Sequence, residues 1–313
     1  MSHSQAGALF VLAFLLMANA NAVLSGWLLQ TLHPFTLLFW SFLATSVFFL
    51  LRLRITQSSK ATRISRDSIR PLLLLNIASS LSWIGYFYAL RYIEPAIVSA
   101  LMGGIGPLFV VLSGLVLLRA MSLRQVITST GIIIGAIVLA WASVSEQSAV
   151  QNVSQTHIVV GLAAALIGGF GQVLTTLSTK RLADQNWDAS QLMAHRFYLL
   201  IAVSGFAAFN GPGLTVQTIP DLFGLLLVGI FGVLVPLWLL QKGIIHSSSF
   251  TVSVLLALGP LMTLCFQGFD SRLTTSLWSA IGCVIIVVST VNNFLVGGVK
   301  LPFSDRIKEA TNG

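Results

Sequence analysis

The sequence predicts an all-α integral membrane protein in which ten transmembrane helices form two inverted five-helix repeats. Three observations lead to this prediction: a low charge content, the spacing of long apolar runs, and an internal repeat. Of the 313 residues, 56% are hydrophobic and only 8% are Asp, Glu, Lys or Arg. Soluble domains carry about 25% charged residues, and disordered chains are poor in hydrophobic ones. Both of these classes are therefore excluded.

Ten apolar runs are each long enough to cross the hydrocarbon core of a bilayer, which takes about 20 helical residues. In chain order they cover residues 7–29, 35–53, 71–91, 96–118, 125–143, 158–179, 190–209, 220–241, 248–268 and 276–297. The connections are short, so no additional soluble domain is expected. The first run ends in small residues that resemble a signal-peptide cleavage site. Residues 1–9 hold no Lys or Arg, however, which disfavours cleavage.

The basic residues predict how the chain is oriented. If the N-terminus is cytoplasmic, 14 of the 17 Lys and Arg residues fall on the cytoplasmic side. These are Arg52, Arg54, Lys60, Arg63, Arg66, Arg70, Arg119, Arg124, Lys180, Arg181, Lys242, Lys300, Arg306 and Lys308. Only Arg91 and Arg272 fall on the opposite side. Because Lys and Arg are enriched in cytoplasmic loops, both termini are predicted to be cytoplasmic, in the inner membrane of a bacterium. The net charge of +8 then needs no nucleic-acid partner.

An internal repeat relates the two halves of the chain. The fourth apolar run contains Gly106-Pro107 near its middle, and the ninth contains Gly259-Pro260. Each half has five helices, so the second half must enter the membrane from the opposite side, as in many secondary transporters. Proline breaks a helix, and the freed carbonyls are tolerated at membrane depth where they face protein or a wet cavity. These four residues are predicted to line a substrate cavity, although Gly and Pro are also simply common in membrane helices.

A family resemblance follows from the residues around the first Gly-Pro pair. The stretch YALRYIEPAIVSALMGGIGPLFVVLSGLVLLRAMSLRQVITSTGIIIGAIVLAW, and its weaker echo from Leu237 to Val291, resemble the second part of an EamA-type repeat. The chain thus resembles the ten-helix form of the drug/metabolite transporter superfamily. The resemblance implies one repeat over residues 1–145, a second over residues 156–298 and a cytoplasmic tail at 299–313. It also implies a central cavity built mainly by spans three, four, eight and nine.

One ionisable pair, His195 and Arg196, lies well inside a span. A charge at that depth is expensive and usually functional. One interpretation is an anion-binding Arg196 beside a proton-coupling His195. The other is that Arg196 is structural: its long stem reaches the headgroups at the nearer membrane surface, a behaviour called snorkelling, or it bonds one helix to another.

Uncharged side chains supply the remaining candidates for the substrate site. Amides and aromatic rings inside spans either contact substrate or hold helices together. The candidates are Asn21 in span one, Trp83 and Tyr86 in span three, Met102 in span four, Gln172 in span six, and Trp238 and Gln241 in span eight. Every Asp and Glu lies in a loop, in the tail or at a span end, which argues against a pump for cationic drugs.

No catalytic constellation is present, so neither an enzyme, nor a cofactor, nor a metal site is predicted. The sequence lacks GxSxG, Walker A and HExxH motifs. The leading hypothesis is a secondary exporter of small polar metabolites, such as amino acids or their derivatives, with a secreted metal chelator as a narrower version. A multidrug exporter and a metabolite importer are the alternatives within transport. A membrane enzyme and a non-transporting scaffold are the alternatives outside it. The expected partners are a small-molecule substrate and the lipid bilayer, and a homodimer is left open.

Overall fold

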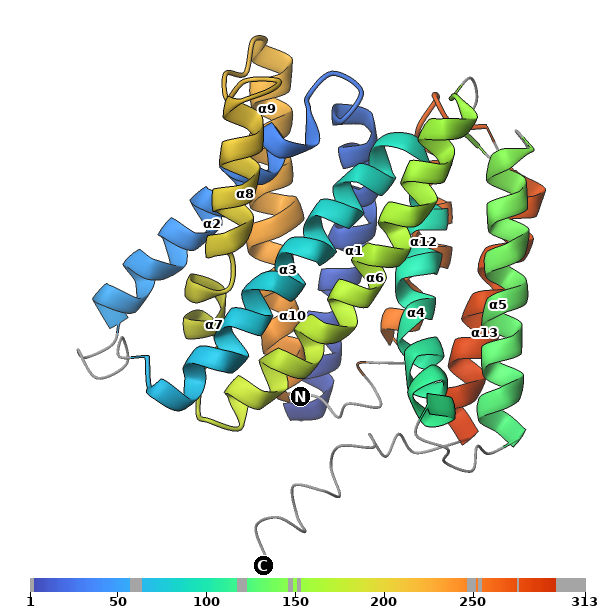
Figure 1. Cartoon of the computed structure of the whole chain (residues 1–313), viewed down its shortest axis with the longest axis horizontal. Coiled ribbons are helices and arrows are strands. Elements are labelled where there is room, and N and C mark those ends of the chain that lie inside the picture. The colour runs from blue at the N-terminus through green and yellow to red at the C-terminus, as the bar shows by residue number, and fades with distance from the viewer. Residues whose placement is uncertain are drawn as a thin grey trace, which may run out of the picture.

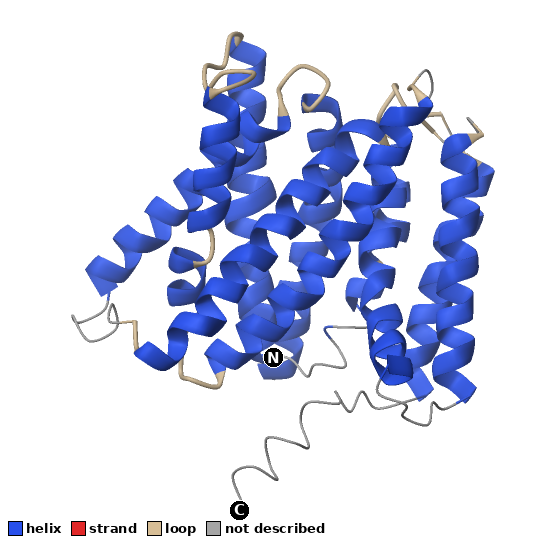
Figure 2. Cartoon of the chain, in the orientation of Figure 1, coloured by secondary structure: helices blue, strands red, loops and turns tan. Residues whose placement is uncertain are grey.

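The structure is a computed structural model of the chain, and it describes residues 3–56, 64–116, 123–145, 149–150, 153–246, 252, 255–274 and 276–296. These residues form helices joined by turns, and none of them is in a strand (Figure 2). The predicted all-α class is therefore confirmed. The predicted tail at 299–313 lies outside the described residues.

The helices follow the ten predicted spans closely. The first half contains α1 (His3–Leu28), α2 (Pro34–Thr56), α3 (Arg66–Tyr92), α4 (Pro95–Val116) and α5 (Leu123–Val144). The second half contains α6 (Gln155–Ala183), α7 (Ala189–His195), α8 (Tyr198–Phe209), α9 (Ile219–Leu227), the π-helix η1 (Val228–Leu234), α10 (Val235–His246), α12 (Gly259–Gln267) and α13 (Leu277–Val296). Seven helical stretches in the described residues are long and apolar enough to cross a membrane, and three shorter apolar ones fall in spans four, nine and ten.

The two halves run in opposite directions through the bundle. In Figure 1, α1 rises from the end that carries the N-terminus, whereas α6 descends toward that same end. We name the two ends after residues that lie at them. At the Arg66 end, α2 and α6 finish and α3 and α7 begin. At the Glu94 end, α3 and α12 finish and α4 and α13 begin.

Packing between the halves follows the same symmetry. Helix α3 packs along α6, and α1 packs in the equivalent way along α9, η1 and α10. Helices α5 and α13 form a pair, as do α2 with α7–α8 and α4 with α12. Every one of these pairs joins one repeat to the other, so relative movement of the repeats must occur at these contacts.

Small residues bring α3 and α6 into close contact. A Cβ atom on Gly85 would lie 2.5 Å from the Ala164 carbonyl oxygen, and one on Gly171 would lie 2.6 Å from the Ser82 amide nitrogen. Small residues are what allow the backbones of membrane helices to approach this closely. The orientation of α3 in the bundle is therefore set by α6.

Two second-half spans depart from the continuous helices that the sequence predicted, and a third is interrupted beside the Gly259-Pro260 pair, where a break was predicted. Span seven is broken between α7 and α8, span eight contains η1, and span nine turns at Leu258 before α12 begins. Pro260 lies in the first turn of α12, where its missing amide is harmless. Pro236 follows η1 and cannot donate to the carbonyl of Gly232, and the Val235 amide instead bonds the Ile230 carbonyl, five residues back.

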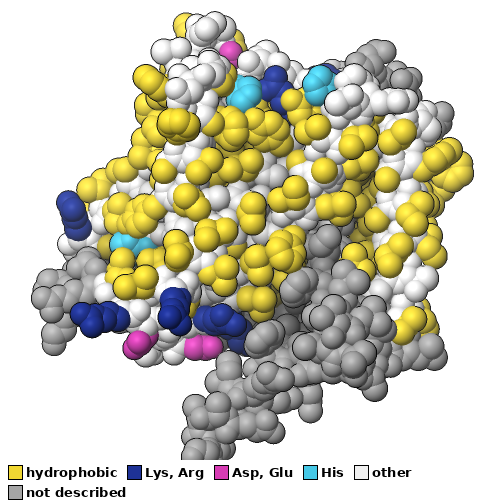
Figure 3. Space-filling view, viewed as in Figure 1, with side chains coloured by type: hydrophobic (Ala, Val, Ile, Leu, Met, Phe, Trp, Pro, Cys, Tyr) yellow, Lys and Arg dark blue, Asp and Glu magenta, His cyan; other side chains and the backbone are white. Residues whose placement is uncertain are grey.

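The outer surface of the bundle is apolar between two more polar rims. Figure 3 shows hydrophobic side chains covering the middle of the visible face, with several Lys and Arg below them and both His and Lys or Arg near the top. Large apolar side chains are exposed on several helices, for example Ile137, Phe170, Phe223 and Val288. Such a surface is stable in lipid and not in water. The chain is thus a multi-pass membrane protein.

Candidate functional site

Span seven is interrupted at the pair of residues that the sequence singled out. Helix α7 ends at His195, and α8 begins at Tyr198. The side chain of Asn76, on α3, donates to the His195 carbonyl at 2.9 Å and accepts from the Leu199 amide at 3.2 Å. In a continuous helix those two backbone groups would bond each other. Asn76 therefore replaces the missing helical hydrogen bond and stabilises the break.

Arg196 lies inside the bundle at this break. Its side chain is only 5% exposed, and its Nε donates to Oγ of Ser79 at 3.3 Å. Its Cζ lies 4.8 Å from the ring centroid of Phe197. Ser79 is the central residue of α3, so the guanidinium lies near the middle of the span. The side chain packs against α3 instead of extending to the headgroups, so the structure shows a bond between helices and not snorkelling. A role of Arg196 in substrate binding remains a prediction.

No carboxylate neutralises Arg196 within the described part of the chain. Asp270 forms a salt bridge with Arg272, far along the sequence at the Glu94 end. A buried charge without a counter-ion is costly, and intramembrane charges usually mark a functional site. We call Arg196, Ser79, Asn76 and Phe197 the Arg196 site.

His195 faces a different set of partners from Arg196. Its Nδ1 lies 2.6 Å from the Tyr198 hydroxyl, and its ring packs edge-on against Trp187 with centroids 5.8 Å apart. No described contact joins the imidazole to the guanidinium. The predicted coupling role of His195 remains a prediction.

An aromatic path connects the Arg196 site to two other predicted residues. The ring of Phe197 lies 4.7 Å from that of Phe42, and Phe42 lies 4.9 Å from Trp83. Trp83 in turn contacts Tyr86, with centroids 5.7 Å apart. The structure therefore brings Trp83 and Tyr86 toward Arg196 through Phe42, a residue that sequence reasoning did not select.

Met102 lies near the Tyr86 end of this path, whereas Gln172 lies farther along α6. A Cβ atom on Gly168 would lie 3.2 Å from both Met102 Cε and the Tyr86 amide nitrogen, so α3, α4 and α6 meet there. Gln172 follows one turn later on α6 and is exposed, although Gly168 and Thr175 on the same side of the helix are buried. The predicted contact of Gln172 with substrate remains a prediction.

A polar seam lies where α1, α4 and α12 meet. Helix α12 presents Gly259, Thr263 and Gln267 on one face, because residues four apart share a face of a helix. Thr263 donates to Oδ1 of Asn19 on α1 at 2.6 Å. A Cβ atom on Gly259 would lie 3.3 Å from Oγ of Ser99 on α4. We call Gly259, Thr263, Asn19 and Ser99 the central seam. Pro260 is buried next to it.

Asn21 lies outside the central seam. Its amide packs against Gly232 of η1, and its Oδ1 is buried without a hydrogen-bond partner among the described residues. The sequence favoured Asn21 over Asn19 as a cavity residue, whereas the structure places Asn19 in the central seam and Asn21 against η1. Asn19 and Asn21 both lie about two turns before the end of α1. Their positions in the sequence therefore do not show which of them faces the other repeat's polar groups.

Two further pairs of predicted residues lie apart from the Arg196 site. Trp238 lies toward the Arg66 end, where the Arg52 and Lys242 cations are 5.9 and 5.7 Å from its ring centroid. Gln241 is buried in the same helix. Gly106 and Pro107 lie within α4, which continues through them, so the backbone break expected in span four is absent. Their side chains are outside the described residues.

Sequence reasoning missed Glu94, which it assigned only to a span end. Glu94 lies in the two-residue link between α3 and α4 and is fully buried. Its Oε1 accepts from Nε2 of Gln267 at 2.7 Å, while its Oε2 accepts from the Ala149 amide at 2.9 Å and from Oγ of Ser279 at 2.7 Å. We call these four residues the Glu94 junction. The signal in the sequence is the short link itself, because two residues between apolar helices leave little room to reach water.

The fold and these polar junctions define a class of protein: a multi-pass α-helical membrane protein built from two inverted repeats that meet across buried polar contacts. The chain belongs to the EamA-like transporter family, which matches it over residues 5–141 and again over residues 159–295. It is therefore a membrane transporter of the drug/metabolite transporter type, as the sequence resemblance predicted.

A solved structure shows the same fold. A chain described only as "Crystal structure of protein" is 17% identical, with a TM-score of 0.65 over 97% of this chain and 100% of that one. At this identity the likeness concerns the fold alone. No curated protein matches the chain.

Proposed function

We propose that the protein is a secondary transporter that exports small polar metabolites bearing a carboxylate, such as amino acids or their derivatives. The two repeats would exchange inward-open and outward-open shapes around the central seam. Membership of a transporter family and the antiparallel repeats support this mechanism. The absence of a nucleotide-binding motif from the sequence leaves an ion gradient or the substrate gradient as the driving force.

The observation that carries the substrate class is the unneutralised charge of Arg196. A guanidinium offers several donors in a planar fork, of which the described contacts use one, to Ser79. A substrate carboxylate would supply both the missing charge and acceptors for two parallel hydrogen bonds. The rings of Phe197, Phe42 and Trp83 would pack against the apolar part of such a substrate.

Charge distribution supports an orientation with the Arg66 end in the cytoplasm. The described basic residues near that end are Arg52, Arg54, Arg66, Arg70, Lys180, Arg181 and Lys242, whereas Arg91 and Arg272 lie at the Glu94 end. This distribution agrees with the excess of Lys and Arg in cytoplasmic loops. We infer a bacterial inner-membrane location with both termini inside. Reporter fusions at Gly313 and within the 57–63 segment test it, and a periplasmic signal from either fusion contradicts it.

Counterflow in proteoliposomes tests the function. Vesicles loaded with unlabelled amino acids should accumulate labelled amino acid, and the neutral amides of the same compounds should compete at least tenfold less well. Arg196→Lys should reduce uptake at least tenfold, because an ammonium lacks the planar fork. Arg66→Lys, at an exposed position, is the matched control and should be unaffected. Equal uptake by wild type and Arg196→Lys would remove Arg196 from recognition. Absence of any counterflow over a broad panel of metabolites would contradict transport itself.

A further inference from the structure

We propose that the Glu94 junction is the gate at the Glu94 end of the bundle, closed in this structure, and that Glu94 must release its partners for the gate to open. This inference rests on the proposed alternating-access function. It goes beyond it by assigning one gate to named residues.

The partners of Glu94 come from three separate segments. Gln267 ends α12, and Ser279 lies in the first turn of α13. Ala149 belongs to the link between α5 and α6. Glu94 itself connects α3 to α4. One carboxylate therefore ties the first repeat to two helices of the second and to the connection between the repeats.

Gln267 strengthens this tie by a second hydrogen bond. Its Nε2 donates to Glu94, and its Oε1 accepts from the Ala96 amide at 2.6 Å. That amide is one of those that the start of a helix leaves without an intrahelical partner. Helix α4 therefore cannot move away from α12 at this end without breaking both bonds. Helices α4 and α12 occupy equivalent places in the two repeats, so their separation is the movement that would open a path between the halves.

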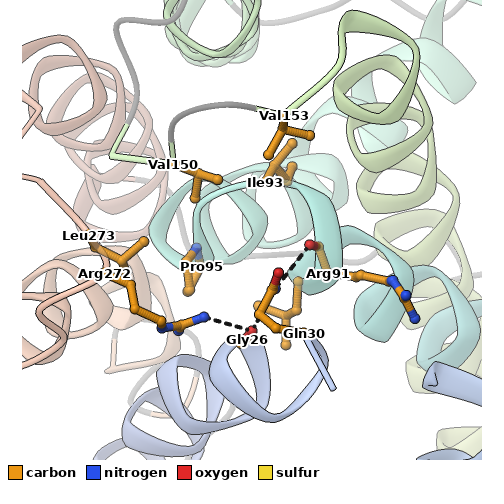
Figure 4. Close-up of a pocket in the computed structure, with 10 residues that line it drawn as sticks. Gly26, Gln30, Arg91, Ile93, Pro95, Val150, Val153, Arg272 and Leu273 are labelled. Atoms are coloured by element: carbon orange, nitrogen blue, oxygen red, sulfur yellow. Dashed lines mark hydrogen bonds between the residues drawn. The ribbon is translucent and has the colours of Figure 1, made fainter. Parts of the chain in front are cut away.

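A cavity of about 270 Å³ lies directly beside the junction, lined on one side by Ile93 and Pro95, the neighbours of Glu94 in sequence. Figure 4 shows Arg272 reaching across this cavity toward Gly26 at the end of α1. Its Nη1 donates to the Gly26 carbonyl at 3.2 Å.

The cavity is bridged a second time by Gln30, whose Nε2 donates to the Arg91 carbonyl at 3.3 Å. The guanidinium of Arg91 points away from the cavity (Figure 4). The bonds that bridge the cavity are long and partly exposed, whereas those of Glu94 are short and buried. The cavity is thus an outer vestibule, and the Glu94 junction is the closed layer beneath it.

The hydrogen bonds of the Glu94 junction can be broken and re-formed as the gate opens and closes. A buried carboxylate is stable only when donors replace its hydration. Three donors do so here, and the vestibule supplies water to replace them when the gate opens. The neutral isostere of Glu94 could not accept at both oxygens, because its NH₂ group would face donors. Glu94→Gln should therefore weaken the closed state without changing the volume of the side chain.

The chain contains its own reporter for this movement. Cys283 lies one turn after Ser279 on α13, is fully buried, and its thiol contacts the Ala96 carbonyl with the sulfur 3.6 Å from the oxygen. The chain has two cysteines, and the other, Cys265, is exposed. In a Cys265→Ser background, Cys283 is the single thiol, and its accessibility reports whether α13 has separated from α4.

The test is the rate at which a membrane-impermeant maleimide labels Cys283 when added from the Glu94 side. In the Cys265→Ser background this rate should be low, and Glu94→Gln should raise it at least tenfold. Ser279→Ala removes one donor of three and should raise it less. An unchanged rate in Glu94→Gln, in protein that remains folded, would overturn the proposal.

A second thiol separates gate opening from general loosening. In protein lacking both native cysteines, Ala194→Cys places a thiol at a fully buried position of α7, toward the Arg66 end. Glu94→Gln should leave labelling of this thiol unchanged. Equal increases at both positions would mean that Glu94 only stabilises the fold, and the gate would be rejected. The assay needs no substrate, so its result is independent of whether counterflow is detected.

Discussion

Two charged residues are buried where the repeats meet, and they differ in how their charges are satisfied. Glu94 accepts hydrogen bonds from three donors in three segments. Arg196 makes one long hydrogen bond, to Ser79, and lies over the ring of its neighbour Phe197. A buried charge that is fully hydrogen-bonded holds structure together, whereas one with free donors can bind a ligand. Burial alone therefore does not identify a charge that binds a ligand; its remaining hydrogen-bonding capacity does.

The Arg196 site and the Glu94 junction both depend on α3, so the largest effect should come from displacing that helix. Gly85→Leu would place a side chain where a Cβ atom already lies 2.5 Å from backbone. Because backbone cannot yield as a flexible side chain does, we expect a loss of about 4 kcal/mol or more, and little folded protein in the membrane. Gly103→Ala is the control, since nothing lies within 4 Å of its Cβ position. Normal expression of Gly85→Leu would show that the α3–α6 contact adapts.

Removing the charge of Glu94 should mainly lower stability, whereas removing that of Arg196 should mainly abolish transport. Glu94→Ala leaves the donors of Gln267, Ala149 and Ser279 without their acceptor, at a cost of about 1–3 kcal/mol for each buried group. Arg196→Ala leaves only the Ser79 hydroxyl, so its cost should be about 1 kcal/mol. Thermal unfolding in detergent should show a larger fall in Tm for Glu94→Ala, while counterflow should be lost in Arg196→Ala. Equal falls in Tm would contradict the distinction between the two sites.

Supplying Arg196 with an internal counter-ion tests whether its unneutralised charge binds substrate. Ser79→Asp places a carboxylate beside the guanidinium, which is 3.3 Å from the serine hydroxyl in the wild-type protein. The Tm should be maintained or raised, because the new carboxylate neutralises a buried charge, and transport should fall at least tenfold because the site is occupied. Ser79→Asn is similar in size but neutral, so it should retain transport. Loss of transport in both variants would show that shape at Ser79 matters more than charge at Arg196.

The smallest expected effect is a pH dependence of stability at the Glu94 end. Burial, and next the charge of Arg91, lower the pKa of His33 from its ordinary value of 6.5. The unfolded chain therefore takes up the proton first as the pH falls below that value, and stability decreases until folded His33 is protonated as well. Above pH 6.5 this residue should have no effect. His33→Gln should reduce the slope of Tm between about pH 6.5 and 5, and an unchanged slope would assign the effect to another group.

The membrane class, the ten spans and the repeat could all be predicted from the sequence. These properties depend on hydropathy summed over about 20 residues, which needs no knowledge of neighbours in space. It also found Arg196, because a charge within an apolar run is conspicuous, and it found Trp83 and Tyr86 from their depth in span three. These predictions required only the chain and its distance from the membrane surfaces.

Only the tertiary structure decided what those residues contact. Gln267 and Glu94 lie 173 positions apart, and no local pattern shows that they bond. No Gly or Pro marks the break at Arg196 in the sequence. The break is stabilised instead by Asn76, which comes from another helix. The choice of Asn19 over Asn21 depends on Thr263 in the opposite repeat. Hydrogen-bond partners inside a bundle are set by packing between distant segments, so a sequence shows which groups are buried before it shows what satisfies them.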